Sequence, residues 1–363
     1  MDDSSLDDIA RQLSDLEVAL FLCLAAREHC LIETTSDGIN DLGKELALIC
    51  SQTFGLSYSI VDFDSTTTIE EIHNDILTVD ARKSQERPLY SRRKTGSSSS
   101  VSAYLSLQDR SKSPIPSLAP DEINVVNVII AKNFNLVNDD LQVQALHLMR
   151  TRKLAIEMKI LNAPADFMFL PLVARDSDQL QPLLKAHLND NLLVSYFHDP
   201  MDGYMYLEES DWLSDGQLSA SSVIHKPKHA EKITAKVNQT MIEKLREETD
   251  AVTTSAEVAR YIQDIIVFLR LSRAVAGGIS AKANIQFSRL AKLLAPLHGM
   301  DYLTPSIVSL AARKVFRHRI IVASPDDDRS LQYGSDLAAV SHILVDITPD
   351  SILDGVLALE PPI

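Results

Sequence analysis

The stretch Ile123–Lys153, INVVNVIIAKNFNLVNDDLQVQALHLMRTRK, decides the fold class of this chain. Five of the six residues Val125–Ile130 are β-branched, and such a nearly continuous apolar strand is typical of a parallel sheet covered on both faces. After a polar turn, apolar residues recur at helical spacing at Leu141, Ala145, Leu148 and Met149. In α/β nucleotide-binding domains, ligands bind at the carboxyl ends of such strands. Here Lys132 and Asn133 stand at that end, where acidic residues are expected.

The composition predicts an intracellular globular protein. The 363 residues are enough for two domains with linkers, and the net charge of −15 argues against a nucleic-acid-binding surface. Cys23, Cys30 and Cys50 lie in apolar stretches without metal-binding spacing, as buried thiols in a reducing compartment do. No window approaches the roughly 18 apolar residues of a membrane span, and the acidic start is unlike a signal peptide. We therefore expect a cytoplasmic protein with no membrane or nucleic-acid partner.

The chain divides into an α/β part and a helical part. Buried strands are predicted at His29–Glu33, Ser57–Phe63, Phe167–Val173 and Leu192–Phe197, and helices at Leu6–Arg27, Leu46–Phe54, Ile69–Leu77 and Gln181–Asn191. Further helices are predicted at 230–246, 255–276, 283–297 and 304–317, with Gly277–Gly278 ending the second of them. We expect an α/β core over 1–80 and 121–200, a disordered Ser/Pro-rich insertion over 81–120, a linker over 201–228, a helical lid over 229–330 and a tail over 331–363.

The segment Gly38–Lys44, GINDLGK, matches the G-x-x-x-x-G-K pattern between a strand and a helix. In a phosphate loop the backbone amides surround the phosphates, and the lysine reaches the outer ones. Two features depart from the pattern: Glu45 replaces the Ser or Thr that would hold Mg²⁺, and several residues separate the strand end at Glu33 from Gly38. The alternative is an Asp-Gly turn followed by a helix that Asp41 caps.

Four segments resemble AAA+ ATPases of the MoxR and magnesium-chelatase ATPase-subunit group. They are Ser14–Glu33 (SDLEVALFLCLAAREHCLIE), residues 128–154, Gly277–Lys282 (GGISAK) and Asp301–Ile320 (DYLTPSIVSLAARKVFRHRI). The resemblance covers most of the chain outside the insertion and the linker. It implies an AAA+ fold, in which a parallel sheet flanked by helices precedes a mostly α-helical lid, and it implies ATP as the cofactor.

The same resemblance identifies where this chain departs from the group. The two acids that hold Mg²⁺ and polarise the attacking water correspond to Lys132 and Asn133. The sensor 1 position falls near Val173 or Ala174, and the segment with a trans-acting arginine corresponds to Leu188–Asn191, which has no arginine. Sensor 2 corresponds to Lys282, a point charge instead of a planar fork. These losses imply a divergent, hydrolysis-deficient member without a Mg²⁺ site, acting as a scaffold or regulatory subunit. The alternative is an active, ATP-hydrolysing subunit of the magnesium-chelatase type that drives a partner.

The candidate nucleotide-binding residues are Gly38, Gly43, Lys44, Asn135 and Lys282, and we expect no catalytic or metal-ligating residue. The expected partners are copies of this chain or AAA+ relatives. We also hypothesise that Glu45 and Lys132 form a salt bridge in place of the metal ion; otherwise both side chains point to solvent. The basic cluster Arg313, Lys314, Arg317, His318 and Arg319 either complements the end of a helix or contacts a neighbouring subunit.

Overall fold

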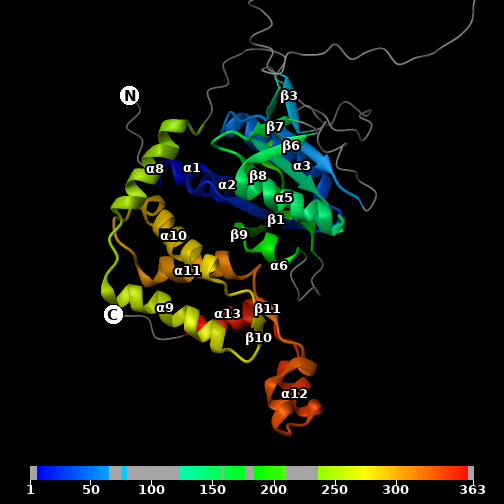
Figure 1. Ribbon diagram of the computed structural model, residues 1–363. Coiled ribbons are helices and arrows are strands. Elements are labelled where there is room, and N and C mark those ends of the chain that lie inside the picture. The colour runs from blue at the N-terminus through cyan, green and yellow to red at the C-terminus, as the bar shows by residue number, and fades with distance from the viewer. Residues whose placement is uncertain are drawn as a thin grey trace, which may run out of the picture.

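The computed structural model describes residues 6–64, 76–79, 123–156, 159–175, 184–209 and 236–358. The expected insertion over 81–120, most of the helix expected at Ile69–Leu77 and residues 210–228 of the expected linker lie outside the described residues. The described chain forms a sheet-containing core, and a helical lid follows it and packs beside it (Figure 1).

The core is built on a five-stranded parallel sheet in the order β2-β5-β8-β1-β9. Its strands are β1 (His29–Thr34), β2 (Tyr58–Asp62), β5 (Val128–Lys132), β8 (Met168–Ala174) and β9 (Leu192–Phe197). Every residue of β1 is buried, as the apolar pattern of the strands predicts for a sheet covered on both faces. Because all strands run the same way, their last residues lie at one edge, the carboxyl edge, and their first residues at the other, the amino edge.

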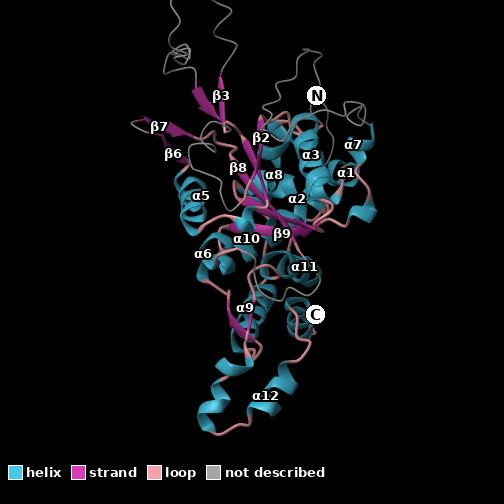
Figure 2. Ribbon diagram, turned by 90° about the vertical axis from the view of Figure 1, so that its right-hand side faces the viewer, coloured by secondary structure: helices cyan, strands magenta, loops and turns pink. Residues whose placement is uncertain are grey.

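Helices cover both faces of the sheet (Figure 2). On one face lie α1 (Leu6–Gln12), α2 (Asp15–Ala26) and α3 (Ile39–Leu48), which η1 (Ile49–Thr53) continues; on the other lies α5 (Asp139–Thr151). The single helix expected at Leu6–Arg27 is divided because Ser14 caps α2: Glu17 N donates to Ser14 Oγ, and Ser14 N donates to the Glu17 carboxylate. The helix expected at Gln181–Asn191 is shorter in the structure, where α6 spans Ala186–Asn189.

Two small antiparallel sheets and the lid complete the described chain. One sheet pairs β3 (Leu77–Val79) with β4 (Ile123–Val125), and the other pairs β6 (Lys153–Ile156) with β7 (Lys159–Asn162). The lid contains α8 (Gln239–Ala251), α9 (Ala256–Leu271), β10 (Val275–Gly277), α10 (Ala281–Leu297), α11 (Pro305–Phe316), β11 (Ile321–Val322), α12 (Leu337–Leu344) and α13 (Pro349–Leu357). The prediction that Gly277–Gly278 ends a helix is wrong, because α9 ends at Leu271 and Gly277 pairs with β11.

The lid shares one hydrophobic core with the sheet. Helix α10 packs against α2, and α11 packs against the edge strand β9. The rings of Phe287 and Phe316 join α10 to α11 at 5.1 Å between centroids. One continuous apolar cluster extends from Ile32 in β1 to Leu353 in α13. Core and lid are therefore packed as one body, while α12 projects from it (Figure 1).

A buried histidine of β1 makes the stability depend on pH. Phe169 N donates to His29 Nδ1 at 3.0 Å, and Nε2 lies 3.3 Å from Met149 O, so the ring is neutral in the fold. Burial lowers the pKa of His29 to about 4. A folded pKa below the unfolded one gives stability that is complete above about pH 6.5 and is lost as the pH falls towards 4. Between pH 7.5 and 5 this residue should remove about 2 kcal/mol of the free energy of unfolding.

Chemical denaturation at pH 7.5 and pH 5 measures this loss. The His29→Gln variant keeps a donor and an acceptor but does not titrate in this range, so its loss should be smaller by about 2 kcal/mol. Equal losses for the two proteins would show that His29 is not the group responsible.

Candidate functional site

Lys132 has a fixed set of partners at the carboxyl edge. Its Nζ donates to Asn40 Oδ1 of α3 at 2.9 Å and to Asp62 Oδ2 of β2 at 2.8 Å. Asn133 Nδ2 donates to the other oxygen of Asp62 at 3.0 Å. The Lys132 side chain is only 13% exposed. Its ammonium group therefore lies where β2, β5 and α3 meet, held by a carboxylate and an amide oxygen, which are groups that could otherwise ligate a divalent cation.

Glu45 has different partners, so the hypothesised salt bridge to Lys132 is wrong. The Glu45 carboxylate accepts hydrogen bonds from Tyr206 N at 3.0 Å and Leu207 N at 2.8 Å, in the first turn of α7 (Met205–Glu209). The alternative of two solvent-exposed side chains is wrong too, since Glu45 is 3% exposed. Burial raises the pKa of this carboxyl, and the two backbone donors offset part of the effect. Glu45 thus fixes a later segment of the chain onto α3.

That later segment, residues 198–209, covers the amino end of α3, and we call it the cover segment. It contains η4 (Pro200–Asp202) and α7, so the prediction of an irregular linker is wrong for its described part. Thr34 Oγ1 donates to His198 O at 2.9 Å, and Tyr204 OH donates to Gly38 O at 3.4 Å. The first turn of a helix can bind an anion through its free amides. In this chain, protein atoms of the cover segment pack over that turn.

A second buried carboxylate anchors the cover segment. Glu17 of α2 accepts hydrogen bonds from Thr53 Oγ1 at 2.6 Å and from the hydroxyl of Tyr206. Lys236 Nζ donates to the same hydroxyl and lies 4.7 Å from the centre of the Tyr206 ring. Burial alone would raise the pKa of Glu17, but these hydrogen bonds and the nearby ammonium lower it. The Glu17 carboxylate is therefore charged at neutral pH and holds Tyr206 in place.

The G-x-x-x-x-G-K segment is helical for most of its length. Helix α3 begins at Ile39 with Gly38 at its N-cap, so a phosphate loop over Gly38–Lys44 is wrong, and so is the alternative of a helix capped by Asp41. Lys44 Nζ pairs with Asp41 at 3.1 Å, and the Lys44 side chain is 43% exposed. Gly43 faces the side chain of Lys132. Phosphate binding by Gly38, Gly43 and Lys44 stays a prediction.

The two other candidate residues lie apart from each other. Asn135 is half-buried in η3 (Phe134–Leu136), which follows β5 at the carboxyl edge. Lys282 lies at the amino edge, where its Nζ donates to Asn191 Oδ1 and where it lines a cavity of about 350 Å³ together with Glu28 and Arg150. A strand rises about 3.3 Å per residue, so the five steps from the first to the last of the six residues of β1 separate the two edges by about 17 Å. The structure therefore does not bring Lys282 to Lys44 or Asn135.

Sequence reasoning missed an ion cluster at the end of β1. Arg175 Nη1 lies 2.9 and 3.0 Å from the two carboxylate oxygens of Glu33, which is 3% exposed. Arg317 of the lid lies 3.9 Å from the same carboxylate. Glu33 and Arg175 stand at the ends of two predicted strands, and Asp62 ends a third. Charged residues at the ends of strands that are expected to be neighbours were therefore the sequence feature that could have identified Glu33, Arg175 and Asp62.

The first hypothesis for the basic cluster is confirmed in part, because Arg313 and Lys314 lie in the last turn of α11 and Arg319 donates to Val315 O. The cluster also docks the lid onto the core of the same chain, which neither hypothesis proposed. His318 Nε2 lies 3.1 Å from Leu192 O, and the Arg319 guanidinium donates to the carbonyl oxygens of Leu192 and Leu193. Arg319 is 2% exposed. Burial lowers the pKa of Arg319 to about 10, so it stays charged at neutral pH. The pair His318 and Arg319 therefore fastens the lid to the amino end of β9.

The two glycines of the G-x-x-x-x-G-K segment have different surroundings. Substituting each of them therefore tests whether Gly38 is required for packing beneath the cover segment. A Cβ at Gly38 would lie 2.8 Å from both Pro200 Cγ and Thr34 Oγ1, whereas a Cβ at Gly43 would meet only the flexible Lys132 and Leu172 side chains at 3.1 Å or more. We expect Gly38→Ala to cost about 1–3 kcal/mol through overpacking. Gly43→Ala, inside a helix, should change the free energy of unfolding by less than about 1 kcal/mol.

Urea denaturation of the two variants tests this difference. Equal losses of stability would mean that the cover segment does not pack on Gly38 as described.

The part of the chain that the structure describes holds no group of three His, Cys, Asp or Glu side chains placed to bind a metal ion. Among the described residues, no helix combines the length and apolar character that a membrane crossing requires.

Comparisons with known proteins agree with this architecture. A family model described as the AAA lid domain matches residues 268–337. A solved structure described as a candidate ATPase, from Cytophaga hutchinsonii, superimposes with a TM-score of 0.59 at 15% identity, covering 99% of this chain and 94% of that one.

Two curated relatives match a part of the chain. Both are named "Maintenance of telomere capping protein 2". The protein from Kluyveromyces lactis is 30% identical over 100 residues (26% of this chain), and the one from Lachancea thermotolerans is 30% identical over 112 residues (30% of this chain). The chain spans little more than a third of the length of these relatives, 36% and 39%. Sheet order, flanking helices, lid match and structural similarity together show that this chain has the AAA+ fold with an AAA lid domain.

Proposed function

We propose that this chain is an AAA+-type subunit that does not hydrolyse ATP and acts as a scaffold or regulatory partner. The observation that carries the proposal is the position of Lys132. Its ammonium group is bound to Asp62 and Asn40 at the end of β5, so a divalent cation at the same place would meet a fixed positive charge. Phosphoryl transfer depends on metal ions that neutralise the developing charge. A protonated lysine cannot be displaced there without breaking both hydrogen bonds.

The surroundings of α3 support the same proposal. The amides that would surround the β- and γ-phosphates belong to the first turn of a helix that Pro200 and Tyr204 cover. Nucleotide binding would require the cover segment to move away from Glu17 and Glu45. Both carboxylates are buried and hydrogen-bonded to that segment. ATP binding therefore needs a direct test. The residues expected to bind the nucleotide are Gly38, Gly43, Lys44, Asn135 and Lys282.

The amino edge supports assembly with copies of this chain or with AAA+ relatives. Lys282 is hydrogen-bonded to Asn191, the last residue of the segment that aligns with the trans-acting arginine segment of the MoxR and magnesium-chelatase group. Two residues from separate candidate motifs thus meet on one surface, as they would if both faced a neighbouring subunit. Leu188, Asn189 and Asn191 are themselves buried, so we propose that the half-buried Asp190 and Lys282 present this contact to the neighbour.

A nucleotide titration tests the proposal. A ligand at about a hundred times its dissociation constant raises the free energy of unfolding by about 2.7 kcal/mol, which a thermal shift detects readily. We expect no shift that depends on Mg²⁺ and no phosphate release above background. Phosphate release that Lys44→Ala abolishes would overturn the proposal and favour an active ATPase of the magnesium-chelatase type.

Measuring the mass of wild type and of Lys282→Glu in solution tests the proposed contact with a neighbouring subunit.

The two curated relatives favour a second, cellular assignment. They are named for the maintenance of telomere capping, and stretches of 100 and 112 residues align with this chain at 30% identity. We propose that this chain serves the same process. The test is to express it in Kluyveromyces lactis cells that lack the relative and to score telomere integrity. Failure of an expressed, folded chain to restore any capping defect of those cells would contradict this assignment.

A further inference from the structure

The amino edge of the sheet holds a cavity of about 350 Å³ with an excess of positive charge, which we call the basic cavity. Its cationic residues come from the ends of α2, α5 and α10, and they are Arg27, Arg150, Arg152 and Lys282. Among the described residues that line it, Glu28 is the only carboxylate and Met149 is the only apolar side chain. The whole chain has a net charge of −15, so four cations around one carboxylate reverse the sign of the charge locally.

The four cations have no carboxylate partner among the described residues. The ion pairs that those residues form include none of Arg27, Arg150, Arg152 and Lys282. The carboxylate of Glu28 lies 3.9 Å from Arg289 Nη1, outside the set of four. Lys282 Nζ donates to Asn191 Oδ1, which is a neutral amide oxygen. The positive charges of the basic cavity are therefore not neutralised by ion pairs.

The titration of two lining residues reflects these unpaired charges. Burial lowers the pKa of Lys282; two nearby carboxylates oppose this shift, but Arg319 and Arg150 add to it. Burial also lowers the pKa of His29, to which Lys282 and Arg152 contribute. The cations therefore repel one another across the cavity, and an anion between them would relieve this repulsion.

The ends of two helices account for part of the positive charge. Arg27 and Arg152 are the C-caps of α2 and α5, and a cation stabilises the C-terminus of a helix. Arg152 Nη2 also donates to Arg27 O at 3.4 Å. A helix end carries about half a negative charge, so the two ends together with Glu28 offset about two of the four cations. About two positive charges remain without compensation.

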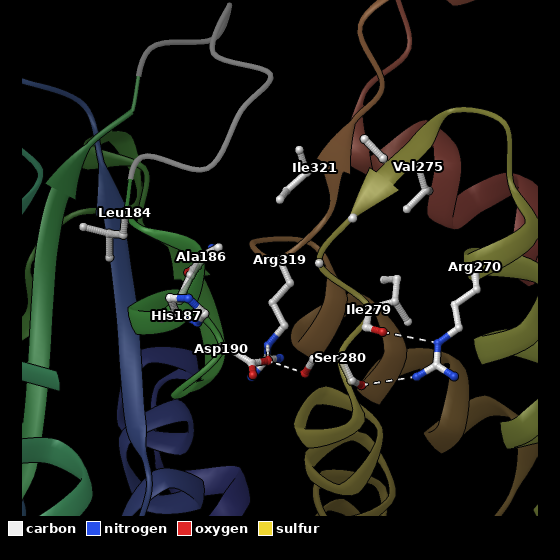
Figure 3. A pocket seen from close by; sticks show the side chains of 14 residues that line it. Leu184, Ala186, His187, Asp190, Arg270, Val275, Ile279, Ser280, Arg319 and Ile321 are labelled. Atoms are coloured by element: carbon white, nitrogen blue, oxygen red, sulfur yellow. Dashed lines mark hydrogen bonds and ion pairs between the residues drawn. The ribbon is translucent and has the colours of Figure 1, made fainter. Parts of the chain in front are cut away.

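The larger cavity between the core and the lid, of about 600 Å³, is less positive (Figure 3). There Asp190 Oδ1 lies 3.9 Å from Arg319 Nε, so one of its two arginines has a carboxylate partner. The other, Arg270, donates to Ile279 O at 3.2 Å and to Ser280 O at 3.5 Å. That cavity leaves one cation without a carboxylate and the basic cavity leaves four, so the basic cavity is the better match for an anion.

We propose that the basic cavity binds a small phosphorylated ligand. A phosphate group carries a charge of about −1.5 to −2 at neutral pH, which matches the uncompensated charge, and arginine binds phosphate through parallel hydrogen bonds. A water molecule occupies about 30 Å³ of the liquid, so a phosphate ion fills only part of about 350 Å³. Because Met149 is the only apolar lining residue, the rest of the ligand is polar. The site does not rest on the proposed function, since it lies at the edge opposite Lys132.

Calorimetric titration of the full chain in a phosphate-free buffer tests the proposal. The probes are inorganic phosphate, glucose 6-phosphate and, as the matched compound without a phosphate, glucose. We expect both phosphorylated probes to bind with dissociation constants of about 1 mM or below, and glucose not to bind measurably. Tighter binding of glucose 6-phosphate would identify a phosphate ester as the ligand, and equal binding would identify inorganic phosphate. The proposal is overturned if neither phosphorylated probe binds below about 10 mM, or if glucose binds as well as glucose 6-phosphate.

Two variants locate the site and leave Lys282, which belongs to the proposed subunit contact, unchanged. Arg27→Gln and Arg150→Gln each remove one charge from an exposed residue, so both proteins should fold normally and bind phosphate about tenfold more weakly. The matched control is Arg260→Gln, an exposed arginine of α9 that does not line the cavity, and it should leave binding unchanged. Melting curves confirm folding. Phosphate binding that neither Arg27→Gln nor Arg150→Gln weakens would overturn the assignment to the basic cavity.

Discussion

Replacing Gly278 by alanine will destabilise the protein by about 3 kcal/mol or more, one of the largest effects expected of a single methyl group in this chain. Gly278 has φ +95°, a conformation that residues with a Cβ rarely adopt. A Cβ built there would lie 1.8 Å from Arg319 O and 2.6 Å from its carbonyl carbon. Both atoms belong to the backbone, so no rotamer change relieves the overlap. The β10–β11 pairing and the docking of Arg319 would have to separate.

Gly355→Ala is the matched control. Gly355 is an exposed residue of α13, and nothing lies within 4 Å of a Cβ built on it. Alanine favours a helix over glycine by about 0.5–1 kcal/mol, so this variant should be slightly more stable. Guanidinium denaturation followed by circular dichroism measures both variants. A Gly278→Ala protein as stable as Gly355→Ala would show that Gly278 does not pack against the backbone of Arg319 as described.

Arg175→Ala will cost about 3 kcal/mol because it leaves a buried carboxylate with little compensation. Glu33 is 3% exposed and receives both of its short contacts from Arg175. Removing one partner of a buried ion pair typically costs about 3–5 kcal/mol. Arg317 Nη1 lies 3.9 Å from the Glu33 carboxylate and still offsets part of its charge in the variant. The expected loss of stability is therefore at the lower end of that range. The measurement is the midpoint of urea unfolding at pH 7.

A double-mutant cycle separates the ion pair from the packing of its side chains. Glu33→Gln removes the charge with almost no change of shape, so the pair Glu33→Gln with Arg175→Ala should lose less stability than the sum of the single losses. We expect a coupling of about 1–3 kcal/mol. As a surface comparison, Arg11→Ala breaks a pair whose arginine is 73% exposed, and it should cost less than about 1 kcal/mol. Additive losses at Glu33 and Arg175 would contradict the contact of Arg175 Nη1 with both carboxylate oxygens.

Local patterns predicted the frame of the molecule well. The β-branched run of β5 and the apolar run of β9 identified strands of the parallel sheet, because a strand covered on both faces must be apolar along its whole length. Strand β9 has the predicted bounds, Leu192–Phe197. The amphipathic helices α9, α10 and α11 start within two residues of their predicted positions, since their apolar spacing and caps are local.

The site depended on contacts that no local pattern contains. The bonds from Tyr206 and Leu207 to Glu45 cross about 160 residues, and the partner of Lys132 proved to be Asp62 on a neighbouring strand. A G-x-x-x-x-G-K pattern states residue types but not where a helix begins. In this chain α3 begins directly after the first glycine, Gly38, so the lysine that should have reached a phosphate lies inside the helix and pairs with Asp41.

The buried guanidinium of Arg319 has a mechanical consequence. Ligand-driven machines often convert binding into movement through a hinge between two domains. In this chain such a movement would pull Arg319 of the lid away from Leu192 O and Leu193 O of the core strand β9, and each separation would leave a buried polar group unpaired. The barrier to rotation is therefore the sum of several lost hydrogen bonds to a charge. A force applied at α12 would be transmitted to the edge strand β9 with little change in the angle between lid and core.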